Sequence, residues 1–378
     1  MKVLILSAST GGGHKRAAAA LEEKIRVLSP GTEVHVVDGL RSIGKVYDKT
    51  VCKGYYIMAT KAPKVYGKFY KITDQKNAMY KAVMRSNSMM SERLLETIEE
   101  YNPDILIMCH PFISAMVSRL KRKGQTNVKA ISIITDYDSH RTYISPNIDA
   151  YVVAEPQMAK KLMEEYGVDE SKIYPLGIPT FDKFSEPGKK EEICAREGLD
   201  SGKTTILLMA GSFGVSGVLN FYEQLAKANK DLQFIVITGK NEKLYEKFKK
   251  HIAELGTEDN TKLLFFVNNV EDYMHVSDLI VTKPGGLTVT ESIACHLPMA
   301  IYSAYPGQEL DNVKFLISQN AAILVDKELG AQQILGLLNS PTALAEMRKN
   351  CKRLSHPQAA EDILKLAAEL TKTNGVLK

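Results

Sequence analysis

The sequence has few cysteines and no long apolar run. Its cysteines are odd in number and form no Cys-x-x-Cys pair: Cys52, Cys109, Cys194, Cys295 and Cys351. This spacing excludes a disulfide framework and a structural zinc site, and it predicts a reducing cytoplasm. No stretch reaches the roughly 18 apolar residues that a membrane-spanning helix needs. The first residues, MKVLILSAST, are apolar only briefly, so we interpret them as a β-strand entering a glycine turn rather than as a signal peptide.

The 378 residues suit two domains of roughly 150–200 residues each. Most candidate strands are continuous apolar runs, as in parallel strands that are covered on both faces. They are Val3–Leu6, Glu33–Val37, Asp104–Met108, Val128–Thr135, Ala150–Ala154, Thr205–Met209, Gln233–Thr238, Leu263–Val267, Leu279–Val281, Met299–Tyr302 and Ala322–Val325. Helical periodicity fills the intervals, for example at Ala17–Leu28, Met89–Glu100, Gln157–Tyr166 and Tyr245–Leu255. This alternation predicts an α/β fold of two Rossmann-like, doubly wound domains that face a cleft.

A stretch that mixes proline, glycine and charge, Gly177–Lys203, separates the two halves. We expect an N-terminal domain at residues 1–180 and a C-terminal domain at residues 200–350. The last two predicted helices, Thr342–Leu354 and Gln358–Leu370, precede no further strand. We therefore expect them to pack back across the domain junction, with residues 355–378 returning to the N-terminal domain.

The most informative segment is Asp278–Asn312, which reads as a strand, a Lys-Pro-Gly-Gly loop and a helix that opens at Leu287. Glycines at the mouth of a helix let backbone approach a ligand, and the helix N-terminus favours an anion. The expected ligand contacts are Lys283, Pro284, Gly285, Gly286, Leu287 and Thr288. Thr288 and Glu291 have the spacing of a capping box; alternatively, Glu291 points into the cleft and holds a diol.

Amide and carboxylate groups follow the next strand, in the Pro306-Gly307-Gln308-Glu309 turn and at Asn312. Gln308, Glu309 and Asn312 are of the kind that bind sugar hydroxyls. Together with the Lys-Pro-Gly-Gly loop, they predict a site for a phosphorylated, hydroxyl-rich small molecule.

A second glycine-rich loop lies between a strand and a helix at Ala210–Gly217. It fits a diphosphate cradle of backbone N–H groups, built from Gly211, Ser212, Phe213, Gly214 and Gly217. No Gly-Lys-Ser/Thr follows, so it is not a Walker loop. Two further strand ends carry Gly239, Lys240 and Asn241, and Phe266 and Val267. These residues either contact the same small molecule or form ordinary turns. In the first case, the backbone after Phe266 would bind the edge of a nucleotide base.

The first loop, Ser9–Lys15, contains three glycines before a helix. We expect Gly12 and Gly13 to clear the mouth of this helix for a substrate that carries a hydroxyl, the acceptor, and His14 to accept a proton from that hydroxyl. The alternative is a tight turn with a surface histidine.

Thr135–His140 contains an Asp-x-Asp pair, for which we favour a role without a metal. Asp136 would then orient the acceptor hydroxyl or His14. We expect His140 at the polar surface. In His110-Pro111-Phe112, core packing of Phe112 is favoured over a His110 that faces the cleft.

Residues 41–85 form a basic insertion, with eleven lysines and arginines against Asp48 and Asp74. That segment carries a net charge of +9, whereas the whole chain carries +5. Six tyrosines are interleaved with the positive charges. A nucleic-acid surface would need an accompanying motif, and a solvated face would contain acids. We favour contact with an anionic membrane surface through Lys53, Tyr55, Tyr56, Lys64, Tyr66, Lys68 and Phe69, with Tyr137 beside the acceptor.

Five segments together resemble the family of monogalactosyldiacylglycerol synthases and processive diacylglycerol beta-glucosyltransferases, a GT28-type family related to the peptidoglycan enzyme that adds N-acetylglucosamine to a lipid carrier. They are GGGHKRAAAA at 11–20, HPFISAMVSRL at 110–120, TDYDSH at 135–140, GIP at 177–179 and KPGGLTVTES…PGQELDN at 283–312. The resemblance extends from residue 1 to about residue 320, with the segments in the family's order.

The resemblance implies a GT-B fold and inverting transfer of glucose or galactose from UDP-glucose or UDP-galactose to diacylglycerol. It implies an N-terminal acceptor domain, a C-terminal UDP-sugar domain, no metal and no other cofactor. The partners it implies are diacylglycerol and anionic membrane lipids, with no nucleic acid, for a cytoplasmic enzyme bound peripherally to the inner face of the cell membrane.

The same resemblance assigns roles to individual residues. His14 takes the position of the base, and Glu291 that of the ribose-binding glutamate. Gln308 and Glu309 take the positions of sugar contacts. The chain departs from the family at two places. Thr180-Phe181-Asp182 occupies a stretch where many relatives have an arginine near the donor phosphates, so Lys183 or Lys283 is expected to replace that arginine. Tyr143 stands where members commonly carry tryptophan.

Other functions stay open at this point. One is transfer of N-acetylglucosamine from its UDP derivative to a polyprenyl-linked acceptor. A UDP-sugar epimerase of the same fold would leave the +9 insertion unexplained. A non-catalytic membrane-binding module would leave the two glycine-rich helix mouths unexplained.

Overall fold

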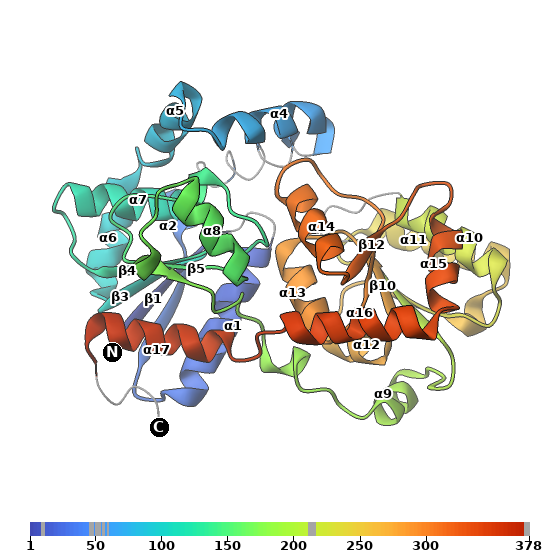
Figure 1. Ribbon diagram of the computed structural model, residues 1–378. Helices are drawn as coiled ribbons and strands as arrows, with labels where there is room; N and C mark the ends of the chain where they lie inside the picture. The colour runs from blue at the N-terminus through green and yellow to red at the C-terminus, as the bar shows by residue number, and fades with distance from the viewer. Residues whose placement is uncertain are drawn as a thin grey trace. The chain divides into compact units, whose positions relative to one another are not determined.

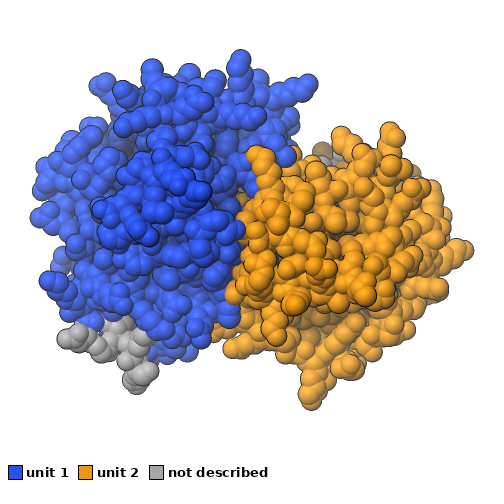
Figure 2. Space-filling model, in the orientation of Figure 1, with its two compact units in different colours: residues 1–181, 305–311, 356–378 blue, residues 182–304, 312–355 orange. Residues whose placement is uncertain are grey.

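The computed structural model describes residues 1–8, 12–44, 49, 54, 57–58, 60–210 and 217–373. The chain divides into two compact units (Figure 2). Unit 1 comprises Met1–Phe181, Tyr305–Asp311 and His356–Lys378, and unit 2 comprises Asp182–Ala304 and Asn312–Ser355. Each contains one six-stranded parallel sheet with helices around it (Figure 1).

The sheet of unit 1 has the strand order β2-β1-β3-β4-β5-β6. Its strands are β1 (Lys2–Ser7), β2 (Glu33–Asp38), β3 (Ile105–Met108), β4 (Lys129–Ile133), β5 (Ala150–Val152) and β6 (Ile173–Tyr174). Its helices are α1 (Gly13–Leu28), α2 (Gly39–Ile43), α4 (Pro63–Thr73), α5 (Ala78–Asn87), α6 (Ser91–Tyr101), α7 (Pro111–Arg122), α8 (Pro156–Glu164) and α17 (Ala359–Thr371). The sequence did not predict β6, because two residues give no periodicity.

One face of this sheet is covered by α1 and α17, which lie side by side in Figure 1. Leu21 and Ile25 of α1 and Ile363 of α17 pack with every second residue of the central strands, such as Ile5 and Ile107. Each such aliphatic side chain contributes about 1.5–3 kcal/mol to folding when it is fully buried. The segment after residue 355 is therefore part of the core of unit 1.

The sheet of unit 2 has the strand order β12-β11-β10-β7-β8-β9. Its strands are β7 (Thr205–Met209), β8 (Gln233–Ile237), β9 (Thr261–Leu264), β10 (Leu279–Thr282), β11 (Met299–Ile301) and β12 (Ala322–Leu324). Its helices are α9 (Lys190–Glu197), α10 (Gly217–Ala228), α11 (Glu242–Leu255), α12 (Val270–Val276), α13 (Gly286–Ala294), α15 (Gly330–Leu338) and α16 (Pro341–Leu354). Helix α14 (Gln308–Ser318) has its first turn in unit 1 and the rest in unit 2.

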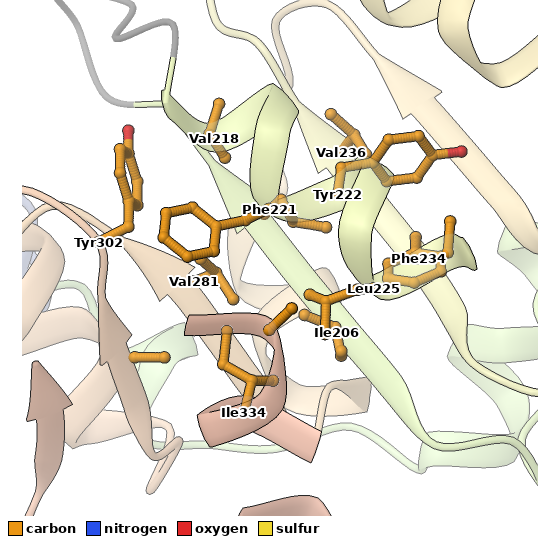
Figure 3. Close-up of a cluster of buried hydrophobic side chains, with 14 of the residues drawn as sticks. Ile206, Val218, Phe221, Tyr222, Leu225, Phe234, Val236, Val281, Tyr302 and Ile334 are labelled. Atoms are coloured by element: carbon orange, nitrogen blue, oxygen red, sulfur yellow. The ribbon is translucent and has the colours of Figure 1, made fainter. Parts of the chain in front are cut away.

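The core of unit 2 joins strands and helices around α10 (Figure 3). Phe221 and Tyr222 of α10 are buried with Val281 of β10 and Ile334 of α15. The predicted strand Leu263–Val267 is wrong at its end, because β9 stops at Leu264 and the two following phenylalanines are exposed.

In both sheets, the later strands are added on the opposite side of the first strand, β1 or β7, from its immediate successor. All strands are parallel, so the loops that follow them lie along one edge of each sheet. Within the described residues, no helix is long and apolar enough to cross a membrane.

Candidate active site

In unit 2, the Lys-Pro-Gly-Gly loop connects β10 to the N-terminus of α13. The helix begins at Gly286 with Gly285 as its N-cap, and no side chain of the described residues caps it. The capping-box alternative is wrong, because the N-cap is Gly285, three residues before Thr288, and Thr288 already lies in the first turn of the helix. An N-terminus without a side-chain cap presents backbone N–H groups and a partial positive charge, which suits an anion such as a phosphate.

Three buried polar residues belong to this loop, to α13 and to the neighbouring α14. Asn312 of α14 is fully buried and donates from Nδ2 to the Pro284 carbonyl at 2.9 Å, so it fixes the loop. Lys283 is 6% exposed and Glu291 is 1% exposed. At the other end of α13, the pKa of the Cys295 thiol is raised, mainly by burial and to a lesser extent by the negative charges of Glu291 and Glu271. Leu287 is buried in the first turn of α13 and anchors it in the core.

The carboxyl end of β7 lies next to that of β10, because the two strands are neighbours in the sheet. Of the contacts predicted in the loop that follows β7, Gly211, Ser212, Phe213 and Gly214 lie outside the described residues. Gly217 is the first residue of α10. A Cβ atom at position 217 would lie 3.5 Å from the Tyr302 ring, so a small side chain there would make ordinary van der Waals contact with that ring.

The loops after β8 and β9 emerge at the same edge of the sheet. Gly239 has a left-handed φ of +61°, and Asn241 caps α11 by accepting from the Leu244 N–H at 3.1 Å. Lys240 places its ammonium 4.8 Å from the ring centroid of Phe266, which is 53% exposed. An exposed aromatic face beside a cation can stack on a planar base. Val267 is half-buried beside it.

Lys183, expected to replace the phosphate-binding arginine, lies in unit 2 after Asp182. Its ammonium is 2.9 Å from Glu271 Oε1 and donates to the Asn268 carbonyl at 3.2 Å. Lys283 follows β10 directly and adjoins the start of α13. Of these two lysines, Lys283 is thus the one that stands at the start of α13.

In unit 1, His14 occupies the second position of α1, after Gly13 and the left-handed Gly12 with φ +77°. Its Nδ1 lies 3.1 Å from Thr135 Oγ1, and its ring meets the His110 ring edge to face at 4.8 Å. These side chains follow β1, β3 and β4, whose carboxyl ends lie along one edge of the sheet. Burial lowers the pKa of His14 to about 4, and a backbone hydrogen bond with Cys109 opposes this effect. His14 is therefore neutral at pH 7 and able to accept a proton.

The structure contradicts the expectation for one of the two neighbouring histidines, His140. His110 is buried and caps α7 by accepting from the Phe112 N–H at 3.3 Å, whereas Phe112 is only half-buried. His140 is also buried rather than at the polar surface, with Nε2 2.9 Å from the Tyr70 carbonyl oxygen. Both imidazoles satisfy backbone groups in the interior, which a sequence pattern does not reveal.

The Asp-x-Asp pair is divided between two partners. Asp138 binds the Lys161 ammonium with both oxygens at 3.0 Å, and Asp136 accepts from the Tyr143 hydroxyl at 3.4 Å. Among the described residues, no group of three or more histidine, cysteine, aspartate or glutamate side chains is arranged to hold a metal ion. No sequence pattern indicates Lys161 as the partner of Asp138. Thr135, which contacts His14, belongs to the motif, but the motif alone does not predict that contact.

The described part of the basic insertion contains α4 and most of α5, and α4 has two different faces. Its lysines Lys64 and Lys68 are exposed together with Val65, whereas Tyr66 and Phe69 are half-buried. Tyr137 is buried as well. Lys53, Tyr55 and Tyr56 lie outside the described residues. The exposed face of α4 is thus basic, and its aromatic side chains turn toward the protein.

The half-buried face of α4 packs on the Pro306–Glu309 turn, which belongs to the same unit. The Tyr66 hydroxyl donates to Gln308 Oε1 at 2.7 Å. Glu309 accepts from the Tyr305 N–H at 2.7 Å, which closes the turn. The turn is therefore held both by its own carboxylate and by α4.

The comparisons with known sequences cover both units. Residues 14–180 match the family described as "Monogalactosyldiacylglycerol (MGDG) synthase", and residues 205–363 match the one described as "Glycosyltransferase family 28 C-terminal domain". The processive diacylglycerol beta-glucosyltransferase of Bacillus subtilis (strain 168) is 31% identical over 376 residues, which cover 98% of this chain and 96% of that protein. The protein of that name from Bacillus pumilus (strain SAFR-032) is 30% identical over 369 residues, with coverage of 96% and 93%.

Solved structures share the fold at low sequence identity. MurG of Acinetobacter baumannii has a TM-score of 0.64 at 14% identity, covering 97% of this chain and 99% of that one. MnaA of S. aureus, solved with UDP, has a TM-score of 0.64 at 13% identity, covering 98% and 96%. At these identities the likeness concerns the fold alone. It confirms the predicted pair of Rossmann-like units of the GT-B class.

Proposed function

Because the chain belongs to the family of processive diacylglycerol beta-glucosyltransferases, a family of UDP-sugar-dependent glycosyltransferases, we propose that it transfers glucose from UDP-glucose to the hydroxyl of diacylglycerol. UDP-galactose is the alternative donor, as one of the two matching family descriptions names a galactolipid synthase. The structural observation that carries the proposal is the start of α13, where a helix end that no described side chain caps follows the buried Lys283, with Glu291 buried further along the same helix.

The proposed donor site uses the loops at the carboxyl edge of the sheet of unit 2. The diphosphate is bound by the N–H groups of the first turn of α13 and by the Lys283 ammonium. Glu291 accepts hydrogen bonds from the ribose hydroxyls, and the base stacks at Phe266. When the sugar–phosphate bond breaks, its electron pair moves to the phosphate oxygen. The helix end and the lysine stabilise that charge, so that a bound metal is not required.

The proposed acceptor chemistry uses His14. The diacylglycerol oxygen attacks the anomeric carbon from the side opposite UDP, a carbon–oxygen bond forms as the bond to UDP breaks, and the hydroxyl proton moves to the neutral imidazole. A single displacement inverts the configuration and yields a β-glycoside. Thr135 holds the imidazole in place, and His110, against its face, restricts its rotation.

The pH dependence of this base follows from its environment. Its protonation removes the lone pair that accepts the proton, so activity falls on acidification through the pKa of His14. Because burial lowers that pKa to about 4, kcat/KM is expected to stay flat from pH 7 to about 5.5 and to halve only near the shifted pKa. The measurement is kcat/KM for diacylglycerol against pH, with activity rechecked at pH 7 after each acid exposure. A decline centred at pH 6.5 would contradict this role.

The exposed basic face of α4 is proposed to bind the anionic membrane surface on which the acceptor resides. Each lysine near such a surface contributes about 1 kcal/mol, so the double change Lys64→Ala and Lys68→Ala should weaken binding to phosphatidylglycerol vesicles about thirtyfold. Vesicle sedimentation measures this effect. The matched control changes Lys243 and Lys247, which are exposed on α11 with the same spacing. Equal losses in both double variants would point to net charge alone, contrary to the proposal.

The proposal is tested by UDP release from UDP-glucose and from UDP-galactose, in EDTA, on vesicles with and without diacylglycerol. Release that requires diacylglycerol and prefers UDP-glucose supports it. Conversion of one UDP-sugar into another without an acceptor would favour an epimerase, and release that requires a polyprenyl-linked acceptor would replace the lipid in the proposal.

A further inference from the structure

We propose that Asp74 and His140 are positioning residues that hold the basic helix α4 at a fixed place relative to His14, so that the base reaches diacylglycerol in a membrane. The inference rests on the proposed function, in which α4 binds the membrane surface and His14 is the base. It concerns unit 1 alone. Two connections carry it: one joins the end of α4 to the Thr135–His140 loop, and the other joins that loop to the base.

Asp74 attaches the carboxyl end of α4, of which it is the C-cap residue. Its Oδ1 accepts from the Arg141 N–H at 2.8 Å and from the Tyr166 hydroxyl at 2.8 Å. Its carbonyl oxygen accepts from Nε of the Arg141 guanidinium at 2.7 Å. The Lys161 ammonium, which binds Asp138, lies 4.0 Å from its Oδ2. The end of α4 is thus bound by the segment that follows β4 and by the segment around α8.

His140 makes a second attachment, four residues earlier in α4. Its Nδ1 accepts from the Thr142 N–H at 3.2 Å, so the neutral ring carries its hydrogen on Nε2 and donates it to the Tyr70 carbonyl at 2.9 Å. The His140 and Tyr70 rings also lie against each other, with centroids 4.2 Å apart. Burial lowers the pKa of His140, which keeps the ring neutral at pH 7.

The same loop contacts the base at its other end. Thr135 follows β4, and its Oγ1 lies 3.1 Å from His14 Nδ1. Thr135 and His140 are five positions apart in the chain, so their Cα atoms are separated by at most about 18 Å. A lipid acceptor stays in the plane of the membrane, and the base must therefore lie at a set distance from the surface that binds the membrane. The short loop fixes that distance.

The inference predicts a loss that depends on how the acceptor is presented. Asp74→Ala should lower kcat/KM for diacylglycerol in phosphatidylglycerol vesicles about tenfold, the lower end of what a hydrogen bond to a charged group carries. With a short-chain diacylglycerol kept below its critical micelle concentration, kcat/KM should change less than about twofold, because a dissolved acceptor reaches His14 wherever α4 lies. Vesicle binding should not change, since Lys64 and Lys68 are intact. His140→Ala should show the same difference between the two acceptors.

Two controls separate positioning from stability. Asp74→Asn keeps an acceptor oxygen for Arg141 and Tyr166, so it should retain most of the activity on vesicles. Asp169→Ala is the matched control in the same unit: Asp169 Oδ1 accepts from the Ser171 N–H at 2.9 Å in an exposed turn. This change should leave activity on both acceptors as in wild type.

Kinetics with the two acceptors, vesicle sedimentation and titration with UDP test the inference. The Kd of UDP should stay constant in every variant, because the proposed donor contacts lie in unit 2. Equal losses with both acceptors, full activity of Asp74→Ala and His140→Ala on vesicles, or a loss of vesicle binding as large as the loss of activity would overturn it. Failure of the proposed function would differ from all of these: the wild type itself would transfer no sugar to either form of diacylglycerol.

Discussion

Replacing His14 by alanine is expected to lower kcat by about a hundredfold to ten-thousandfold, the contribution of a positioned general base. The imidazole is held at the start of α1 by Thr135 and His110, and burial keeps it neutral. Water can replace it only as a weaker and unpositioned base. The measurement is the initial rate of UDP release at saturating donor and diacylglycerol, with the Kd of UDP determined in parallel.

The Kd of UDP should not change in this variant, because the proposed donor contacts lie in unit 2. His251→Ala is the matched control: this histidine lies on the surface of α11 with Nδ1 3.0 Å from the Lys247 carbonyl oxygen. Full turnover of His14→Ala at neutral pH would end the assignment of His14 as the base.

Replacing Lys283 by methionine is expected to lower kcat about a hundredfold, comparable to the loss of one donor that stabilises developing negative charge. Methionine keeps the length and the apolar stem of this buried side chain and removes its charge. Since the charge on the departing phosphate oxygen grows as the bond breaks, the loss should appear in kcat more than in donor KM. Steady-state kinetics with varied UDP-glucose measure both constants.

The control for this variant is Lys349→Met, since Lys349 is exposed on α16. It should behave as wild type. A Lys283→Met enzyme that loses only donor affinity, with kcat intact, would show that the lysine binds substrate and transition state equally, and the leaving group would need another stabilising group.

The sequence predicted the fold well because continuous apolar strands alternate with helical periods, and parallel strands require that pattern. It also placed Lys283, the two glycines and Glu291 at a strand-to-helix junction. One of its two alternatives for Thr288 and Glu291, the capping box, is wrong, because Ser/Thr-x-x-Glu spacing does not tell where the chain enters the helix. That entry is set at Gly285 by the turn after β10.

The remaining errors concern side chains whose partners are distant in sequence. His140 is buried because α4 supplies the Tyr70 carbonyl, 70 residues away. Asn312 has a structural function because Pro284 is its partner, and Tyr66 contacts Gln308 across 242 residues. No local pattern encodes such contacts, since they depend on which surfaces the fold brings together. Sequence therefore located the candidate site, whereas the structure supplied the residues that orient it.

The central claim is formation of a β-glucoside on diacylglycerol, and the most direct measurement is the identity of the product. The enzyme is incubated with UDP-glucose labelled with ¹³C at the anomeric carbon, in EDTA, on vesicles containing diacylglycerol, and the lipid extract is examined by NMR and mass spectrometry. We predict glucosyl diacylglycerol with a β anomeric coupling. An α-linked product, label recovered only as free glucose or as another UDP-sugar, or an absolute need for a metal would contradict the mechanism proposed for His14, Lys283 and α13.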